Sequence, residues 1–201
     1  IDALKGISLQ GDRVRIGALT RHVEVMESPV IAEHVPLIAE AMPNVAHVAV
    51  RNRGTIGGSL ANNDPAACYP AAALGSGATI VTNTREIAAD DYFQGMFSTA
   101  LDEGEIITAV RFPVPEKAAY VKFVQPASRF ALVGVFVART NDGVRVAVTY
   151  RLGREAFYLR KQGHTVTLRE AREKAGGMMR YGIPRYRLPE EVLEREIEQV
   201  L

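Results

Sequence analysis

The amino-acid sequence predicts a mixed α+β fold whose second half is dominated by antiparallel strands. Apolar and polar residues alternate over residues 14–18, which is typical of a half-buried strand. Apolar residues recur at near-helical spacing over residues 30–42, and the later apolar runs are separated by turn residues. A chain of 201 residues with 47% hydrophobic content can bury one sizeable core.

The first predicted elements are a strand and two helical segments. After the strand over residues 14–18, Thr20 can cap a helix with its hydroxyl group, and Glu24 in the first turn suits the positive end of the helix dipole. The helical segment over residues 30–42 contains Pro36, which lacks a backbone donor. We therefore expect this segment to break or kink at Pro36.

The remaining predicted elements are one helix and five strands. Small residues over 66–74 predict a helix that ends at Gly75. Strands are predicted over residues 78–81, 106–112, 119–124, 132–138 and 144–148. The residues Asn-Asp-Gly at 141–143 are a hairpin signal, so the last two strands are expected to pair antiparallel.

The most informative stretch is R-N-R-G-T-I-G-G-S-L-A-N-N-D-P at residues 51–65. Its glycines let the backbone approach a ligand, and successive N–H groups can hold a phosphate. Thr55 and Ser59 add hydroxyl donors, and residues 62–64 add groups that can bond hydroxyls or a heterocycle. The spacing matches neither the Rossmann glycine fingerprint nor the P-loop. The same residue types also form tight surface turns, so composition alone leaves a cofactor cradle and a plain turn both open.

The order of these residues, continued by A-A-C-Y-P-A-A at 66–72, resembles the second flavin-binding loop of the FAD-carrying medium subunit of molybdenum hydroxylases. This is the carbon monoxide dehydrogenase and xanthine dehydrogenase family. Further motifs follow in the family's order, namely G-D-R-V-R-I-G-A-L-T at 11–20, F-S-T-A-L at 97–101, G-E-I-I at 104–107, F-P-V-P at 112–115 and Y-V-K-F at 120–123. The resemblance covers about residues 1–148. It implies part of the family's FAD-binding fold, without the N-terminal FAD subdomain.

By this resemblance the cofactor is FAD. The backbone N–H groups of residues 56–59 are expected to contact its phosphates or ribityl oxygens, together with two nearby hydroxyl groups. Ile107 is expected to lie against the flavin ring and Lys122 near its polar edge, while Asp64 orders the loop or bonds the cofactor. The expected cofactor-binding residues are Thr55, Ile56, Gly57, Gly58, Ser59, Asn63, Asp64, Ile107 and Lys122.

The resemblance also implies a function as an FAD-dependent oxidoreductase subunit. In the family, FAD receives electrons from iron–sulfur clusters on a small subunit and passes them to NAD or a quinone-like acceptor. A large molybdopterin-containing subunit carries the substrate chemistry. The expected partners are therefore the large and small subunits and the electron acceptor, and the cofactor performs the redox chemistry while the protein binds and orients it.

The tail, over about residues 158–201, resembles the small subunit of glutamate synthase through strings such as G-I-P-R-Y-R-L-P. There, Glu170 would bond the FAD ribose and the glycines at 176–177 would approach the flavin. The preceding glycine fingerprint is absent, so the tail should not form a working dinucleotide site. We therefore divide the chain into a medium-subunit-like domain at 1–148 and a fragment at 149–201, possibly across a join, and expect the tail to pack loosely or apart. The alternative functions are an NAD(P)H-dependent flavin oxidoreductase and a non-enzymatic remnant or interaction module.

Composition excludes several other classes of protein. No apolar run approaches the roughly 20 residues that span a bilayer, and no signal peptide opens the chain. The single cysteine, Cys68, cannot form a disulfide or hold an iron–sulfur cluster alone, and it fits a reducing, cytoplasmic location. The four histidines show no metal-ligand spacing. No basic cluster carries interleaved aromatic residues, so nucleic acid is not an expected partner.

Overall fold

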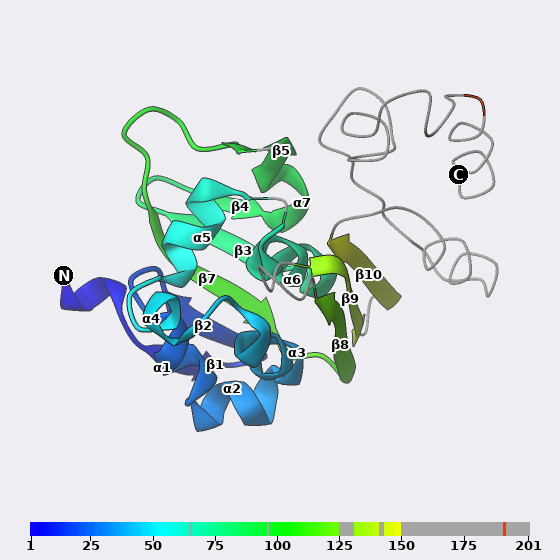
Figure 1. The fold of residues 1–201 in the computed structure, drawn as a ribbon. Helices are drawn as coiled ribbons and strands as arrows, with labels where there is room; N and C mark the ends of the chain where they lie inside the picture. The colour runs from blue at the N-terminus through cyan, green and yellow to red at the C-terminus, as the bar shows by residue number, and fades with distance from the viewer. Residues whose placement is uncertain (65, 96, 125–130, 141–142, 150–190, 192–201) are drawn as a thin grey trace.

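A computed structural model of the 201-residue chain describes residues 1–64, 66–95, 97–124, 131–140, 143–149 and 191. Within these residues a five-stranded sheet has the order β1-β2-β7-β3-β4 and a three-stranded sheet has the order β10-β9-β8 (Figure 1). A small two-stranded sheet joins β5 and β6. Neighbouring strands pair antiparallel throughout these sheets, as the sequence predicts.

Four of the five strands in the first sheet are short, and the strands of the second sheet are longer. The five-stranded sheet contains β1 Ile7–Gln10, β2 Arg13–Gly17, β3 Thr79–Thr82, β4 Glu86–Ala88 and β7 Ile107–Pro113. The three-stranded sheet contains β8 Lys117–Val124, β9 Ala131–Thr140 and β10 Gly143–Thr149, and the small sheet contains β5 Phe93–Gly95 and β6 Ser98–Thr99. All five strands predicted after residue 77 are therefore confirmed. The hairpin residues 141 and 142 lie outside the described residues, but Thr140 and Gly143 are paired.

The helices are mostly short. They are α1 His22–Met26, α2 Pro29–His34, α3 Pro36–Ala41, α4 Val48–Arg51, α5 Ile56–Asn62, α6 Cys68–Ser76 and α7 Ala89–Tyr92, with 3₁₀ turns η1 Asp2–Leu4 and η2 Met42–Asn44. The predicted break at Pro36 is confirmed, because α2 ends at His34 and Pro36 starts α3. Among the described residues, no helix is both long and apolar enough to cross a lipid bilayer.

The predicted cap of α1 is wrong by one residue. Arg21 is the N-cap, and its side chain and backbone N–H both contact the Glu24 carboxylate in a capping box. Thr20 is buried instead, and its hydroxyl group accepts a hydrogen bond from the Gly6 N–H at 3.0 Å. The hydroxyl therefore ties the start of β1 to the turn after β2. A local sequence pattern cannot show such a contact.

Helix α6 lies between the two larger sheets and is buried along almost its whole length (Figure 1). The predicted end at Gly75 is wrong, because α6 continues to Ser76 and the left-handed C-cap is Gly77, with φ of 68°. Gly75 is buried instead, and a Cβ atom there would lie 3.0 Å from Phe136 Cβ and 3.3 Å from Ala147 Cβ. The missing side chain lets the three-stranded sheet approach the helix closely. The core on both sides contains the large buried rings of Tyr69, Tyr92, Phe112 and Phe136.

Candidate functional site

A cavity of about 600 Å³ opens beside the start of α5. Its walls come from residues 45–55, the first turn and the end of α5, and the loop that leads into α6. His22 from α1 and Lys122 from β8 complete the lining. Much of the surface is apolar, and this volume is within the usual range of small-molecule sites. The glycine-rich stretch of the sequence thus borders a real cavity.

Much of the stretch is helical, because residues 56–62 form α5. Thr55 is the N-cap of α5, and its hydroxyl oxygen accepts a hydrogen bond from the Gly58 N–H at 3.2 Å. The three other N–H groups expected to hold a phosphate, those of Ile56, Gly57 and Ser59, donate to the carbonyl oxygens of Thr20, Ala18 and Thr55 respectively. All four N–H groups therefore have partners in the protein. Two of the partners, Ala18 and Thr20, lie in the turn after β2, and the other two bonds go to the helix cap Thr55.

The two neighbouring glycines serve different purposes. A Cβ atom on Gly57 would lie 2.7 Å from Ala18 Cβ and 2.8 Å from the Ala18 carbonyl oxygen, closer than side chains approach one another. Gly57 is therefore a packing residue between α5 and the end of β2. Gly58 is exposed and lines the cavity, and its added Cβ would meet only Thr55 Oγ1, at 3.1 Å.

Five of the nine expected cofactor-binding residues line the cavity. They are Thr55, Gly58, Ser59, Asp64 and Lys122. The other four do not line it: Ile56 and Gly57 are buried, Ile107 lies in the core, and the Asn63 side chain donates to the carbonyl oxygens of Gly95 and Ser98. The fold thus brings Lys122 to the glycine-rich stretch and turns Asn63 toward the small sheet.

Lys122 reaches the cavity from a strand that is distant in the sequence. Its ammonium group donates to the Asn44 carbonyl oxygen at 2.7 Å and approaches Cys68 Sγ at 3.4 Å. Two of the three ammonium protons are thereby directed at the protein, which fixes the charge at the cavity wall. The Cys68 thiol also lies 3.4 Å from the Tyr120 hydroxyl oxygen, so this part of the wall is a small connected polar group.

Asp64 is the single carboxylate among the residues that line the cavity. One of its oxygens accepts a hydrogen bond from the Ala66 N–H at 2.9 Å, which orders the turn into α6. The lining also carries the Arg53 guanidinium and the Ser59 hydroxyl, and neither has a hydrogen-bond or ion-pair partner in the described part of the chain. Two cationic side chains, Arg53 and Lys122, therefore share the wall with one carboxylate. Such a surface favours a ligand that is anionic or rich in acceptors.

Sequence reasoning did not select His22, which is only 5% exposed and lines the cavity. Its ring lies 5.2 Å from the Tyr69 ring, and its Nδ1 atom has no hydrogen-bond partner among the described residues. Burial, helped by the nearby Arg51 charge, lowers the pKa of His22 to about 4, so the ring is neutral at pH 7. A Cβ atom on Gly54 would lie 2.6 Å from its Nε2 atom. The glycine before Thr55 therefore makes room for this imidazole, which a pattern search cannot reveal.

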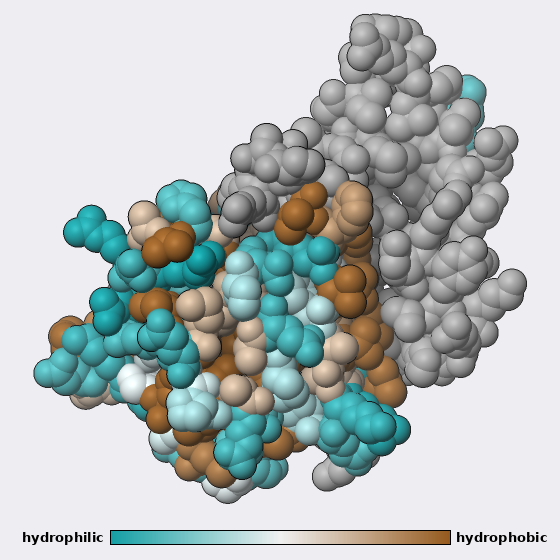
Figure 2. Space-filling model, turned by 60° about the horizontal axis from the view of Figure 1, so that its bottom comes forward, coloured by the Kyte–Doolittle hydropathy of each residue, from teal (hydrophilic) through white to brown (hydrophobic). Residues whose placement is uncertain are grey.

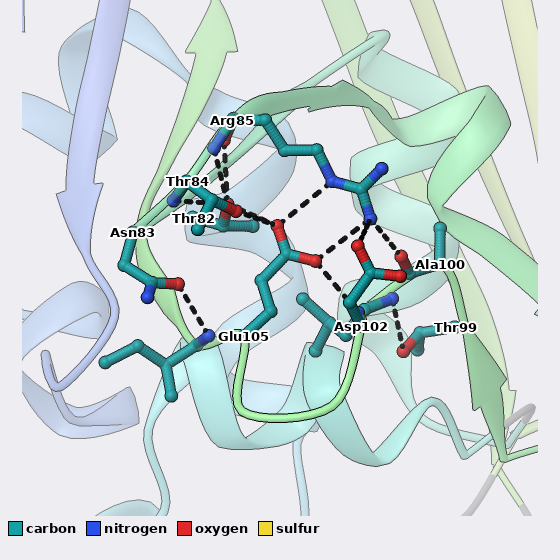
Figure 3. Close-up of polar contacts among 10 residues, drawn as sticks. Thr82, Asn83, Thr84, Arg85, Thr99, Ala100, Asp102 and Glu105 are labelled. Atoms are coloured by element: carbon teal, nitrogen blue, oxygen red, sulfur yellow. Dashed lines mark hydrogen bonds and ion pairs between the residues drawn. The ribbon is translucent and has the colours of Figure 1, made fainter.

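A second polar cluster fixes the strand that carries Ile107 (Figure 3). The Glu105 carboxylate accepts hydrogen bonds from the Thr82 and Thr84 hydroxyls at 2.6 and 2.7 Å, and Arg85 binds both of its oxygens. Its side chain is only 2% exposed, and the hydrogen bond from Arg85 is the largest of the contacts that hold its pKa well below the ordinary range. The turn after β3 is thereby tied to the start of β7. Because the Glu105 carboxylate is fully paired and lies outside the cavity lining, we assign this cluster a structural role.

Comparison with known proteins shows to which family this chain belongs. Residues 1–115 match the family described as the FAD binding domain in molybdopterin dehydrogenase. The chain belongs to this family. The match spans the glycine-rich stretch and most of the cavity, with Lys122 lying just beyond it. The resemblance to the medium subunits of molybdenum hydroxylases is therefore confirmed, and FAD is the family's cofactor.

Relatives of this FAD-binding domain are subunits of hydroxylases and dehydrogenases. The nicotine 6-hydroxylase medium subunit of Paenarthrobacter nicotinovorans is 37% identical over 72% of this chain and 54% of its own length. The carbon monoxide dehydrogenase medium chain of Hydrogenophaga pseudoflava is 34% identical over 74% of this chain and 56% of its own length. A solved structure of carbon monoxide dehydrogenase from the same organism superposes with a TM-score of 0.73 at 28% identity, covering all of this chain and 79% of its own. The chain thus spans about half the length of the curated relatives it matches.

The residues present in the cavity fit FAD. The pyrophosphate of FAD is anionic, and its ring carries carbonyl and nitrogen acceptors, whereas the wall offers the side-chain donors of Arg53, Lys122, Ser59 and Thr55. Apolar residues such as Val45 and Ala67 supply a surface for a flat ring system. The chemistry of the donor set agrees with the family's cofactor.

Proposed function

We propose that this chain is the FAD-binding part of an electron-transfer subunit of a molybdenum hydroxylase. The observation that carries the proposal is the donor-rich cavity beside residues 55–59, within a chain that belongs to the family. When bound, FAD would supply the redox chemistry between iron–sulfur clusters on a small subunit and NAD or a quinone-like acceptor. A molybdopterin-containing large subunit would be the second partner. We expect the assembly in the cytoplasm.

The side chains of the cavity, rather than the backbone N–H groups, would hold the cofactor. We assign Arg53 to the phosphates, because its guanidinium has no partner among the described residues and can form two charge-assisted hydrogen bonds. Ser59 and Thr55 would add hydroxyl donors on the same wall. Gly58 would leave space there for a bulky group, since it has no Cβ. Asp64 keeps the turn into α6 in place by holding the Ala66 N–H.

Lys122 would tune the flavin rather than anchor the phosphates. Its ammonium group contacts the Asn44 carbonyl oxygen and Cys68 Sγ, and the residue lines the cavity. A fixed positive charge beside the ring stabilises an anionic reduced form and raises the midpoint potential. The buried neutral ring of His22 would exclude water from the inner end of the cavity without adding charge.

Flavin titration of the purified chain tests this proposal. Arg53→Met should weaken FAD binding by about tenfold to a hundredfold, since a hydrogen bond to a charged group contributes roughly 1.5–3 kcal/mol. Binding of riboflavin, which has no phosphate, should hardly change. Arg15→Met is the matched control, because it removes the same charge from β2, outside the cavity lining. Lys122→Met should retain flavin but lower its two-electron potential by about 30 mV for each ~1.4 kcal/mol of lost stabilisation.

Two outcomes would contradict the proposal. A wild-type chain that is folded but retains no FAD would favour a non-enzymatic role, which is the alternative that the sequence leaves open. Equal FAD affinity of Arg53→Met and Arg15→Met would remove Arg53 from the site. The NAD(P)H-dependent alternative depends on tail residues outside the described part of the chain. Bleaching of the flavin by NAD(P)H in the absence of any partner subunit would support that alternative.

A further inference from the structure

The cavity beside α5 has a buried inner end and an exposed rim. The inner end is lined by His22, Cys68 and Tyr69, each no more than 5% exposed. The rim includes Arg53 and Gly58, which are exposed. Burial costs a charged group far more hydration free energy than a neutral one. A flavin in this cavity would therefore place its neutral ring at the inner end and its charged pyrophosphate at the rim.

Lys122 reaches the same inner end from β8. Its ammonium group approaches Cys68 Sγ at 3.4 Å. The residue after Cys68 is Tyr69, whose ring centroid lies 5.2 Å from that of His22. Side chains alternate between the two faces of a strand, and the neighbouring Val121 is 72% exposed. Figure 2 shows a strip of hydrophobic residues on the side where Figure 1 places β8. Lys122 therefore points away from the outer surface and toward the cavity, where it supplies one positive charge.

The imidazole of His22 has unused hydrogen-bonding capacity at this inner end. Neither of its ring nitrogens has a hydrogen-bond partner in the part of the chain that the structure describes, and Nδ1 is fully enclosed. A neutral imidazole carries one N–H donor and one acceptor nitrogen. Enclosed N–H groups without a partner are rarer in proteins than enclosed acceptors without one. The favoured tautomer therefore leaves Nδ1 as the enclosed acceptor and carries its proton on Nε2.

Gly54 borders the edge of the ring that carries Nε2. A Cβ atom on Gly54 would lie 2.6 Å from Nε2 and 2.8 Å from Cδ2 of His22. Both residues line the cavity. Any larger residue at position 54 would cover this edge or push the ring away. Because glycine has no side chain, the Nε2–H group can reach a ligand in the cavity.

We propose that the Nε2–H group of His22 donates a hydrogen bond to an acceptor of the flavin ring, either a carbonyl oxygen or a ring nitrogen. This inference rests on the proposed function, because it takes FAD as the ligand of the cavity. A neutral donor suits a neutral acceptor, and it adds no second positive charge at the end of the cavity that already holds Lys122. His22 and Arg53 would then bind opposite parts of one molecule, the ring and the phosphates.

Ligand titrations of the full chain test this contact. His22→Phe keeps a ring against Tyr69 but removes both nitrogens, and it should weaken the binding of riboflavin and of FAD by the same factor, about threefold to tenfold, as the loss of one neutral hydrogen bond predicts. The binding of ADP, which has a pyrophosphate but no flavin ring, should not change. His22→Gln is the matched control, because its amide can place an N–H donor near the position of Nε2. It should retain most of the riboflavin affinity.

NMR of the histidine side-chain nitrogens in the wild-type chain keeps the test decisive should His22→Phe fail to fold. We expect the Nε2–H tautomer of His22, and a shift of its Nε2–H proton resonance when riboflavin saturates the protein. An Nδ1–H tautomer, or an unchanged resonance in the saturated protein, would overturn the inference. Equal riboflavin affinity of wild type and folded His22→Phe would overturn this inference alone. A wild-type chain that binds neither riboflavin nor FAD would contradict the proposed function and, with it, this inference.

Discussion

Gly57 offers the sharpest test of how α5 is positioned. The replacement Gly57→Ala adds one methyl group at a fully enclosed position, 2.7 Å from Ala18 Cβ and 2.8 Å from the Ala18 carbonyl oxygen. Both atoms are attached to the backbone and cannot rotate away. The same carbonyl oxygen accepts the Gly57 N–H at 2.9 Å, so a shift of α5 that relieves the clash also stretches this hydrogen bond.

The magnitude follows from three contributions. Overpacking a filled site typically costs about 1–3 kcal/mol. Weakening the hydrogen bond adds up to about 1 kcal/mol. The better helix propensity of alanine offsets at most about 1 kcal/mol. We expect Gly57→Ala to lower the free energy of unfolding by about 2 kcal/mol, equivalent to a decrease in Tm of about 4–8 °C for a domain of this size.

Gly58→Ala is the matched control in the next position. Gly58 is exposed, and its added Cβ would meet only Thr55 Oγ1 at 3.1 Å. We expect a stability between unchanged and about 1 kcal/mol higher, because alanine is the better helix former. Urea denaturation and thermal melts of both variants measure the difference. Equal unfolding free energies for Gly57→Ala and Gly58→Ala would refute the assignment of Gly57 to packing and of Gly58 to the cavity.

Two pH dependences follow from the buried titratable groups. The pKa of Glu105 is held below its ordinary value, mainly by the hydrogen bond from Arg85. The carboxylate therefore stabilises the fold fully above the ordinary carboxyl pKa, and this contribution is lost as pH falls through the folded pKa. In acid denaturation, the difference in unfolding free energy between wild type and Glu105→Gln should narrow below about pH 4. A constant gap down to pH 2 would contradict this. The pKa of His22 is lowered to about 4 by burial and by Arg51, so the unfolded chain takes up that proton first, and stability should fall between about pH 6.5 and pH 4. His22→Gln should flatten this interval, and an NMR titration that places the His22 pKa near 6.5 would show that the ring is not buried as described.

The sequence by itself determined the family, the antiparallel strands and the break between α2 and α3. These features depend on short-range rules: strand alternation, the missing N–H of Pro36, and an ordered set of motifs around residues 51–65. It also indicated five residues that line the cavity. The hydroxyl, carboxylate and ammonium groups of these residues, and the glycines beside them, can be recognised from the sequence alone.

The tertiary structure alone decided what each residue does. Gly57 and Gly58 are adjacent and identical in chemistry, yet one faces Ala18 and the other faces the cavity. His22 enters the site from α1 because Gly54 leaves room for its ring. Lys122 enters because β8 passes beside Asn44 and Cys68. Backbone N–H groups that a linear pattern offers to a phosphate already donate to Ala18, Thr20 and Thr55. Such outcomes depend on which distant atoms share a volume, because steric exclusion and hydrogen-bond competition act through space rather than along the chain.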